Sequence, residues 1–198
     1  MAAIKRAYPQ YMASGGEALP VELHRLIFPV AFWDEIGAQA TRWKLDPYLL
    51  AALIAQESGF DPQIESSARA VGLMQLLPST ARQYARRLRL GTYRRSMLTT
   101  PNTNLAMGSA LLADLIERFG DLHLALAAYN AGTARVARWV EERAGDGLDR
   151  EEFIDDMPFA ETRNYVRRIL STSQDYRRMY ADTGRVARQS VGGTGEPA

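Results

Sequence analysis

Residues 47–80 read PYLLAALIAQESGFDPQIESSARAVGLMQLLPST, and they place the carboxylate of Glu57 at the end of an otherwise apolar helix. Asp46 and Pro47 favour a helix start, because an aspartate caps free N–H groups and a proline is tolerated at the first helical position. Leucine, isoleucine and alanine fill nearly every following position until Gly59 ends the pattern. A helix that is apolar on nearly all sides is predicted to be buried.

The position of Glu57 predicts a shifted ionisation. The negative end of the helix dipole and partial burial both disfavour the charged carboxylate, so we expect its pKa to rise. A carboxyl group that is still protonated near neutral pH is what general-acid cleavage of a glycosidic bond requires. The alternative is a helix-end glutamate that contacts solvent or an arginine and has no chemical role.

A polar side chain also interrupts the apolar run GLMQLLP at residues 72–78. Gly72 is predicted to form a turn, and the proline opens the next helix. The amide of Gln75 needs hydrogen-bond partners among its apolar neighbours, and a polar ligand in a cleft is one way to supply them. Ser66 and Ser67 in the preceding loop either face the same cleft or are solvated loop residues.

Two later segments carry polar groups at helix ends. AYNAG at residues 128–132 suggests a tight bend between two helices, and a buried Tyr129 would need a partner for its hydroxyl. Taken alone, this segment is interpreted as a turn in the core. Glu161 lies in the first turns of the last predicted helix, where the helix dipole stabilises a charged carboxylate. Glu161 is either the ionised partner of a protonated Glu57, as in a carboxylate pair with separate acid and anion roles, or an ordinary ion-pair partner of Arg163.

Apolar periodicity predicts an all-α chain. The expected helices cover residues 31–44, 47–58, 78–90, 101–119, 122–129, a segment ending near 144, and 158–180, with a polar loop at 91–100. Residues 31–181 are expected to form one domain. Residues 1–30 contain many helix breakers and are predicted to be a connector with short helices at 3–12 and 20–27. Residues 182–198 lack apolar periodicity and are predicted to be disordered.

Composition excludes several classes of function. The 198 residues include 24 basic and 23 acidic side chains, and a net charge of +1 gives no footprint for nucleic acid. Basic runs at 86–89 and 94–95 are interpreted as solvated faces or as groups that attract an anionic polymer. The chain has no cysteine and two isolated histidines, and the acidic run at 145–156 does not match a calcium loop. We therefore expect no metal and no cofactor, and no apolar stretch approaches membrane-spanning length.

Four motifs occur in order: ESGFDP at 57–62, GLMQLLPSTA at 72–81, AYNAG at 128–132 and PFAETRNYV at 158–166. Their order and spacing resemble those of the soluble lytic transglycosylases of bacterial peptidoglycan. The resemblance implies a lysozyme-like helical domain without a cofactor. It also implies cleavage between N-acetylmuramic acid and N-acetylglucosamine that leaves a 1,6-anhydro sugar.

The resemblance also implies roles for particular residues. Glu57 would be the catalytic acid and then the base, and peptidoglycan glycan strands would be the partner. The implied substrate-binding residues are Ser66, Gly72, Met74, Gln75, Tyr129, Asn130, Glu161 and Tyr165. Of these, Tyr129 is also the residue expected to hydrogen-bond Glu57 or the substrate and to hold the acid in place. A hydrolytic muramidase and a non-catalytic glycan-binding or scaffold module remain alternatives.

The resemblance predicts a location outside the cytoplasm. An enzyme that acts on the cell wall is expected in the periplasm or cell envelope, yet the first residues contain no apolar core of a secretory signal. We therefore expect the chain to be a piece of a larger exported protein.

Overall fold

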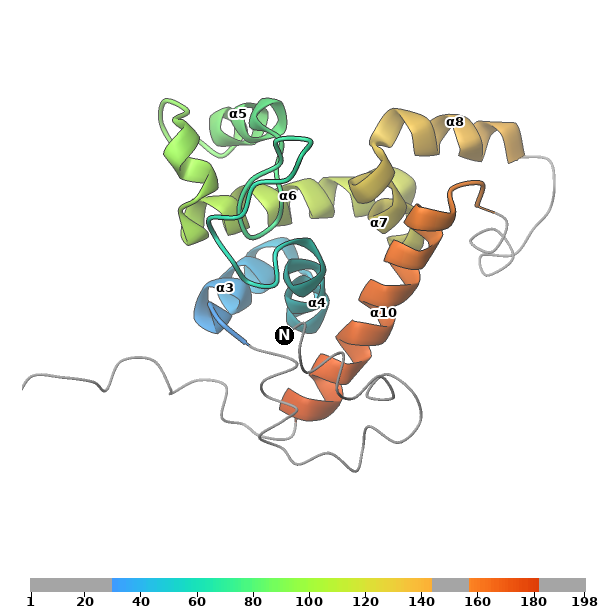
Figure 1. The fold of residues 1–198 in the computed structure, drawn as a ribbon, viewed down its shortest axis with the longest axis horizontal. Coiled ribbons are helices and arrows are strands. Elements are labelled where there is room, and N and C mark those ends of the chain that lie inside the picture. Colours follow the sequence, from blue (N-terminus) through green and yellow to red (C-terminus); the bar gives the residue numbers. More distant parts are fainter. Residues whose placement is uncertain (1–29, 144–156, 182–198) are drawn as a thin grey trace, which may run out of the picture.

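The computed structural model describes residues 30–143 and 157–181, which fold into seven α-helices and one short 3-10 helix (Figure 1). The elements are α3 (Trp33–Trp43), α4 (Pro47–Glu57), α5 (Pro78–Arg87), η3 (Arg95–Leu98), α6 (Pro101–Phe119), α7 (Leu122–Ala131), α8 (Thr133–Arg143) and α10 (Ala160–Tyr180). In these residues, two isolated bridges join Val71 to Glu65 and to Leu76. The predicted all-α class is confirmed.

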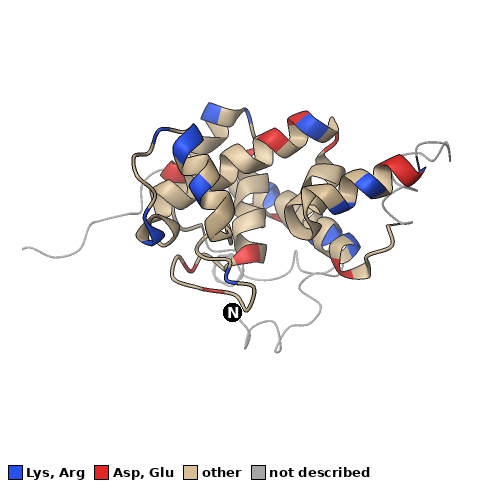
Figure 2. Ribbon diagram, turned by 90° about the horizontal axis from the view of Figure 1, so that it is seen from above, with Lys and Arg blue, Asp and Glu red and all other residues tan. Residues whose placement is uncertain are grey.

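The helix that carries Glu57 lies against two others. α4 packs along α10 and beside α3, while α6 contacts α3, α5 and α7. Figure 1 shows α6 crossing the molecule between α5 and α7, with the long α10 running past α4. Figure 2 shows basic and acidic residues distributed over most helices. None of the described helices is long and apolar enough to cross a membrane.

The start and the core of α4 follow from its sequence. Asp46 accepts a hydrogen bond from the Tyr48 N–H at 3.0 Å, and Pro47 occupies the first turn. Every residue from 49 to 54 is buried, and Leu50, Leu53 and Ile54 are fully buried. Burying each of these side chains contributes about 1.5–3 kcal/mol. The core therefore fixes the axis of α4 and with it the position of its last residue.

Several predicted boundaries are corrected. The segment 91–100 is not a simple loop, because η3 lies within it and its Leu98 is fully buried. α10 begins at Ala160, two residues after the proline that was expected to open it. α5 ends at Arg87, and α7 continues to Ala131. The predictions for 1–29, 144–156 and 182–198 fall outside the described residues, so the division into domains stays a prediction.

Candidate active site

The carboxyl group of Glu57 lies at the end of α4 against α10. It accepts a hydrogen bond from the hydroxyl of Tyr165. Burial raises the pKa of Glu57 from its ordinary 4.5 to about 7, and the Tyr165 hydrogen bond opposes this rise because it stabilises the charged form. Near neutral pH this group therefore exists in both protonation states, and it can give up a proton and take one back.

Tyr165 is suited to remain a donor. Its side chain is 4% exposed, on the part of α10 that meets the end of α4. Burial and the negative charge of Glu57 raise the pKa of Tyr165 well above its ordinary value. The hydroxyl thus keeps its proton throughout the pH range in which Glu57 titrates.

Ser58, the residue after Glu57, ties the end of α4 to the turn at residues 72–75. Its Oγ donates to the Leu73 carbonyl at 2.9 Å, lies 3.1 Å from the Ile54 carbonyl, and accepts from the Phe60 N–H at 3.1 Å. The serine is buried. The end of the helix and the turn therefore keep a fixed relative position.

Asn104 on α6 holds the same turn from the other side. Its Oδ1 accepts from the Met74 N–H at 2.8 Å, and its Nδ2 donates to the carbonyls of Val71 at 3.0 Å and Leu98 at 2.8 Å. The side chain is fully buried. Gly72 has a φ of 83°, and a Cβ there would lie 2.0 Å from the Leu98 carbonyl oxygen. A glycine is therefore required where the turn passes Asn104.

Tyr129 does not bond Glu57 in the structure, although it was the expected partner. Its hydroxyl donates to the Met74 carbonyl at 2.7 Å. The helix that packs along α4 is α10, which gives the contact with Glu57 to Tyr165. Burial, and next the negative charge of Glu57, raise the pKa of Tyr129 well above its ordinary value. Tyr129 is thus near enough to Glu57 to feel its charge and also holds the turn.

Met74 was expected among the substrate-binding residues, and that assignment stays a prediction. The side chain is fully buried and packs against Gly108, where an added Cβ would lie 2.4 Å from the Met74 sulfur. Its two backbone groups bond Asn104 and Tyr129. Met74 therefore acts as the anchor of the turn.

Gln75 finds its hydrogen-bond partners within the protein. Its Nε2 donates to the carbonyls of Ile64 at 3.1 Å and Gly72 at 3.0 Å. The amide nitrogen therefore has partners without a ligand, and the assignment of Gln75 to substrate binding stays a prediction. These bonds use the donors of the amide, so its side-chain oxygen is the atom left to accept from a ligand.

The remaining predicted site residues lie in two places. Ser66 Oγ accepts from the Ala70 N–H at 3.1 Å and closes a turn of the loop. Asn130 at the end of α7 accepts from the Thr162 hydroxyl of α10 at 2.9 Å. Glu161, which precedes Thr162, is exposed in the first turn of α10. The structure thus places Asn130 and Glu161 at the α7–α10 junction.

Two residues that support this site were missed in the sequence. Ser58 and Asn104 fall within the predicted helices 47–58 and 101–119 and were not singled out there. The signal for Asn104 was present, because it interrupts a buried face just as Gln75 interrupts the run at 72–78. Among the residues that the structure describes, no group of three or more metal-binding side chains is placed to hold an ion.

Comparison with known proteins relates this geometry to a family. The model of the transglycosylase SLT domain matches residues 34–151, more than half of the chain. The soluble lytic murein transglycosylase of Salmonella typhimurium is 35% identical over 153 residues, which are 76% of this chain and 23% of that protein. The chain therefore spans about a quarter of the length of this relative.

Solved structures show the same likeness. The 70 kDa soluble lytic transglycosylase in complex with bulgecin A has a TM-score of 0.75 at 31% identity, over 81% of this chain and 26% of that one. A second structure is that of an inactive variant of the Pseudomonas aeruginosa lytic transglycosylase Slt, in which glutamine replaces a glutamate. It has a TM-score of 0.73 at 30% identity, over 89% of this chain and 29% of that one. Together with the matched domain model, these likenesses show that the chain belongs to the transglycosylase SLT domain family.

Proposed function

We propose that this chain is the catalytic part of a peptidoglycan lytic transglycosylase. It would cleave the β-1,4 bond between N-acetylmuramic acid and N-acetylglucosamine and leave a 1,6-anhydromuramoyl end. The observation that carries the proposal is Glu57, whose pKa is raised to about 7 at the end of a buried helix beside a tyrosine donor. Membership of the family supplies the substrate class.

In the first step Glu57 acts as the acid. The protonated carboxyl donates its proton to the bridging oxygen while the bond from that oxygen to C1 of the muramic sugar breaks. The electron-poor C1 centre is assisted by the N-acetyl group of the same sugar, as the family implies. Tyr165 donates to the carboxylate that forms, so it stabilises the charge that appears in this step.

In the second step the same group acts as the base. The carboxylate of Glu57 takes the proton from the C6 hydroxyl as that oxygen attacks C1, which closes the anhydro ring and restores the acid. No water is consumed. A pKa of about 7 serves both steps, because it lies near the pH at which the acid and the base forms coexist.

One carboxylate is enough for this route. The causes that set the pKa of Glu57 are burial and Tyr165, and no carboxylate of the described residues is among them. A retaining glycosidase that uses a protein nucleophile places two carboxyl groups about 5 Å apart. An isolated Glu57 therefore favours attack by a group of the substrate itself.

The substrate would be held by the loop and helix ends around Glu57. We assign the side-chain oxygen of Gln75 and the exposed polar groups of Asn130 and Glu161 to contacts with the glycan or its peptide. The fixed turn beneath Gln75 would keep that oxygen in place.

Peptidoglycan also implies a location outside the cytoplasm, for which the periplasm is our specific proposal.

Digestion of purified sacculi tests the proposal. Mass spectrometry should find products whose muramic ends weigh one water less than reducing ends. Reducing ends would instead identify a hydrolytic muramidase. An absence of any glycan cleavage, with binding retained, would identify a non-catalytic glycan-binding module and refute the proposal.

A further inference from the structure

α5 and the segments that flank it carry positive charge without acidic residues between them. From Ser66 to Ala113 the sequence contains no aspartate or glutamate but does contain the arginines Arg69, Arg82, Arg86, Arg87, Arg89, Arg94 and Arg95. Arg87 pairs with Asp114, and Arg95 pairs with Glu65. The other arginines of this stretch form no ion pair with the described residues.

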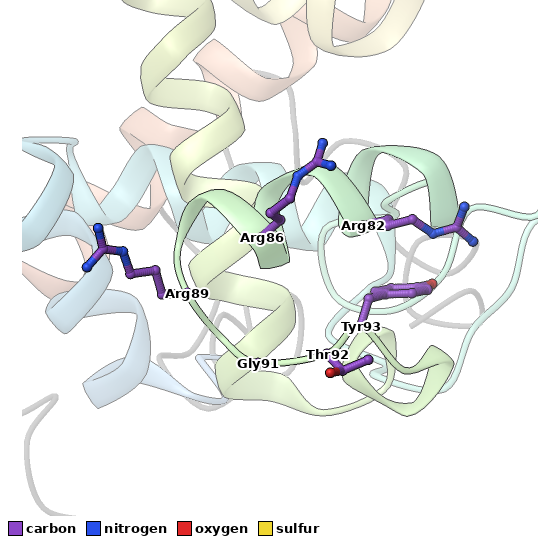
Figure 3. Close-up of a pocket in the computed structure, with 6 residues that line it drawn as sticks. All are labelled: Arg82, Arg86, Arg89, Gly91, Thr92 and Tyr93. Carbon is purple, nitrogen blue, oxygen red and sulfur yellow. The ribbon is translucent and has the colours of Figure 1, made fainter.

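Three of these unpaired arginines surround one pocket. Arg82, Arg86 and Arg89 line a cavity of about 620 Å³ together with Gly91, Thr92 and Tyr93 (Figure 3). All three arginines are exposed. We call this cavity the α5 pocket. Cationic side chains gathered without a carboxylate create a positive potential that favours an anionic ligand.

The backbone at Arg89 suggests that this arginine has a use beyond the fold. α5 ends with the hydrogen bonds Leu90 N–H to Ala85 carbonyl at 2.9 Å and Arg89 N–H to Arg86 carbonyl at 3.2 Å. This pattern usually has glycine at the position of Arg89, because the residue adopts a positive φ, here 55°. An arginine there costs free energy relative to glycine, yet it places a cation at the edge of the α5 pocket.

Tyr93 adds an unsatisfied polar group to the same pocket. Its hydroxyl is inaccessible to solvent and has no hydrogen-bond partner among the described residues. The guanidinium carbon of Arg82 lies 5.5 Å from the centre of the Tyr93 ring and covers it. Buried polar groups without partners are uncommon. An anionic oxygen that draws Arg82 away from the ring would give the hydroxyl an acceptor.

The directions of the arginines indicate what kind of ligand fits. Figure 3 shows the three guanidinium groups pointing away from one another rather than toward a common centre. A compact ion such as phosphate would contact only one of them at a time. Anionic groups spaced along an extended polymer can contact several. This geometry favours a polymer that carries repeated carboxylates.

We propose that the α5 pocket binds carboxylates of the peptide stems of peptidoglycan. This inference rests on the proposed function, which supplies a polymer whose peptides carry carboxylates. α5 begins directly after the loop that holds Gln75 and is 10 residues long, about 15 Å. The pocket at its far end would therefore hold a stem away from the bond that is cut, on the same strand or on a neighbouring one.

Sedimentation with purified sacculi tests the proposal, with the full chain carrying Glu57→Gln so that the polymer stays intact. Adding Arg82→Gln, Arg86→Gln and Arg89→Gln together should weaken binding about tenfold at low ionic strength. The matched control replaces the exposed Arg118, Arg138 and Arg168 by glutamine and should change binding less than about twofold, because the net charge change is the same but lies elsewhere.

A second arm uses sacculi whose carboxylates have been converted to amides. The protein with the three pocket arginines and the variant without them should bind the amidated sacculi equally. Equal binding of the pocket variant and the control variant to untreated sacculi would overturn the inference, and so would a tenfold difference that survives amidation. The latter result would assign the pocket to a ligand other than the stems.

A single variant separates binding from folding. Arg89→Gly should raise the midpoint of thermal unfolding by about 2 °C, because glycine prefers the positive φ, while it lowers sacculus binding. Loss of binding with loss of stability would contradict the proposal.

Failure of the inference is distinguishable from failure of the proposed function. Cleavage of peptide-free glycan chains by the wild-type protein tests the function alone. Anhydro products together with equal binding of the two arginine variants would reject the pocket and keep the enzyme. Arginine-dependent binding without cleavage would keep the pocket and reject the enzyme.

Discussion

The two ends of α4 each present a carboxylate to α10, and the two carboxylates meet opposite surroundings. Asp46 at the start accepts the Tyr48 N–H and pairs with the guanidinium of Arg177, at the protein surface. Glu57 at the end meets the neutral hydroxyl of Tyr165 and is desolvated. Burial penalises the ionised form of Glu57, and the hydrogen bond from Tyr165 offsets only part of that penalty. One helix thus carries one carboxylate that serves structure and another to which we assign the proposed chemistry.

The largest predicted difference between the two ends is in activity. Glu57→Gln should reduce kcat/KM on glycan strands by about 10³, because it removes the proposed proton donor. Asp46→Asn should leave kcat/KM within about twofold and lower stability by less than about 1 kcal/mol, because asparagine keeps the cap and only the ion pair with Arg177 is lost. Release of anhydro products measures the first effect. An active Glu57→Gln protein would remove the basis of the comparison.

The second prediction concerns the framework that supports only the Glu57 end. Asn104→Leu should lower the free energy of unfolding by about 3 kcal/mol, because it removes three buried hydrogen bonds from the turn at 72–75. The matched control is Asn102→Leu on the exposed side of the same helix, with an expected change below about 0.5 kcal/mol. Urea unfolding measures both. Equal effects of the two variants would show that the amide network does not hold the turn.

The third prediction is the pH dependence of stability. Between pH 4.5 and about 7 native Glu57 keeps a proton that the unfolded chain has lost, so its contribution to stability falls as the pH rises through this window. Glu57→Gln lacks this dependence. The variant should therefore gain about 1–3 kcal/mol over wild type between pH 4 and pH 8, a range reduced for the partial exposure of the side chain. A constant difference across that range would contradict the raised pKa.

The smallest predicted effect separates Tyr165 from a purely structural residue. Tyr165→Phe removes the hydrogen bond that lowers the pKa of Glu57, so that pKa should rise further. The alkaline limb of the kcat/KM profile should then move to higher pH. Tyr176→Phe, on the same helix and also buried, should change stability without moving the limb. A limb that stays in place in Tyr165→Phe would exclude the assigned contact.

Local sequence was sufficient to predict the environment of Glu57. The apolar residues of α4 itself predicted that the helix would be buried and that the pKa of its last carboxyl would rise. The cap at Asp46 was equally visible, because the capping side chain and the N–H it accepts are two residues apart.

The partners of these groups were not predictable in the same way. Tyr165 is 108 residues from Glu57 in the chain, and Tyr129 was expected instead from the resemblance of the AYNAG segment. The choice depends on which helix packs along α4, which periodicity does not specify. The partners of Gln75 were missed for a related reason, since the carbonyls it bonds are brought to it by the path of the loop.

The central claim is that the carboxyl of Glu57 remains protonated up to neutral pH. A ¹³C NMR titration of the glutamate side-chain carboxyls in the full chain measures this directly, with Glu57→Gln identifying the signal. We predict a midpoint at about pH 7 for Glu57. A midpoint near 4.5, the ordinary value for a glutamate, would contradict the account.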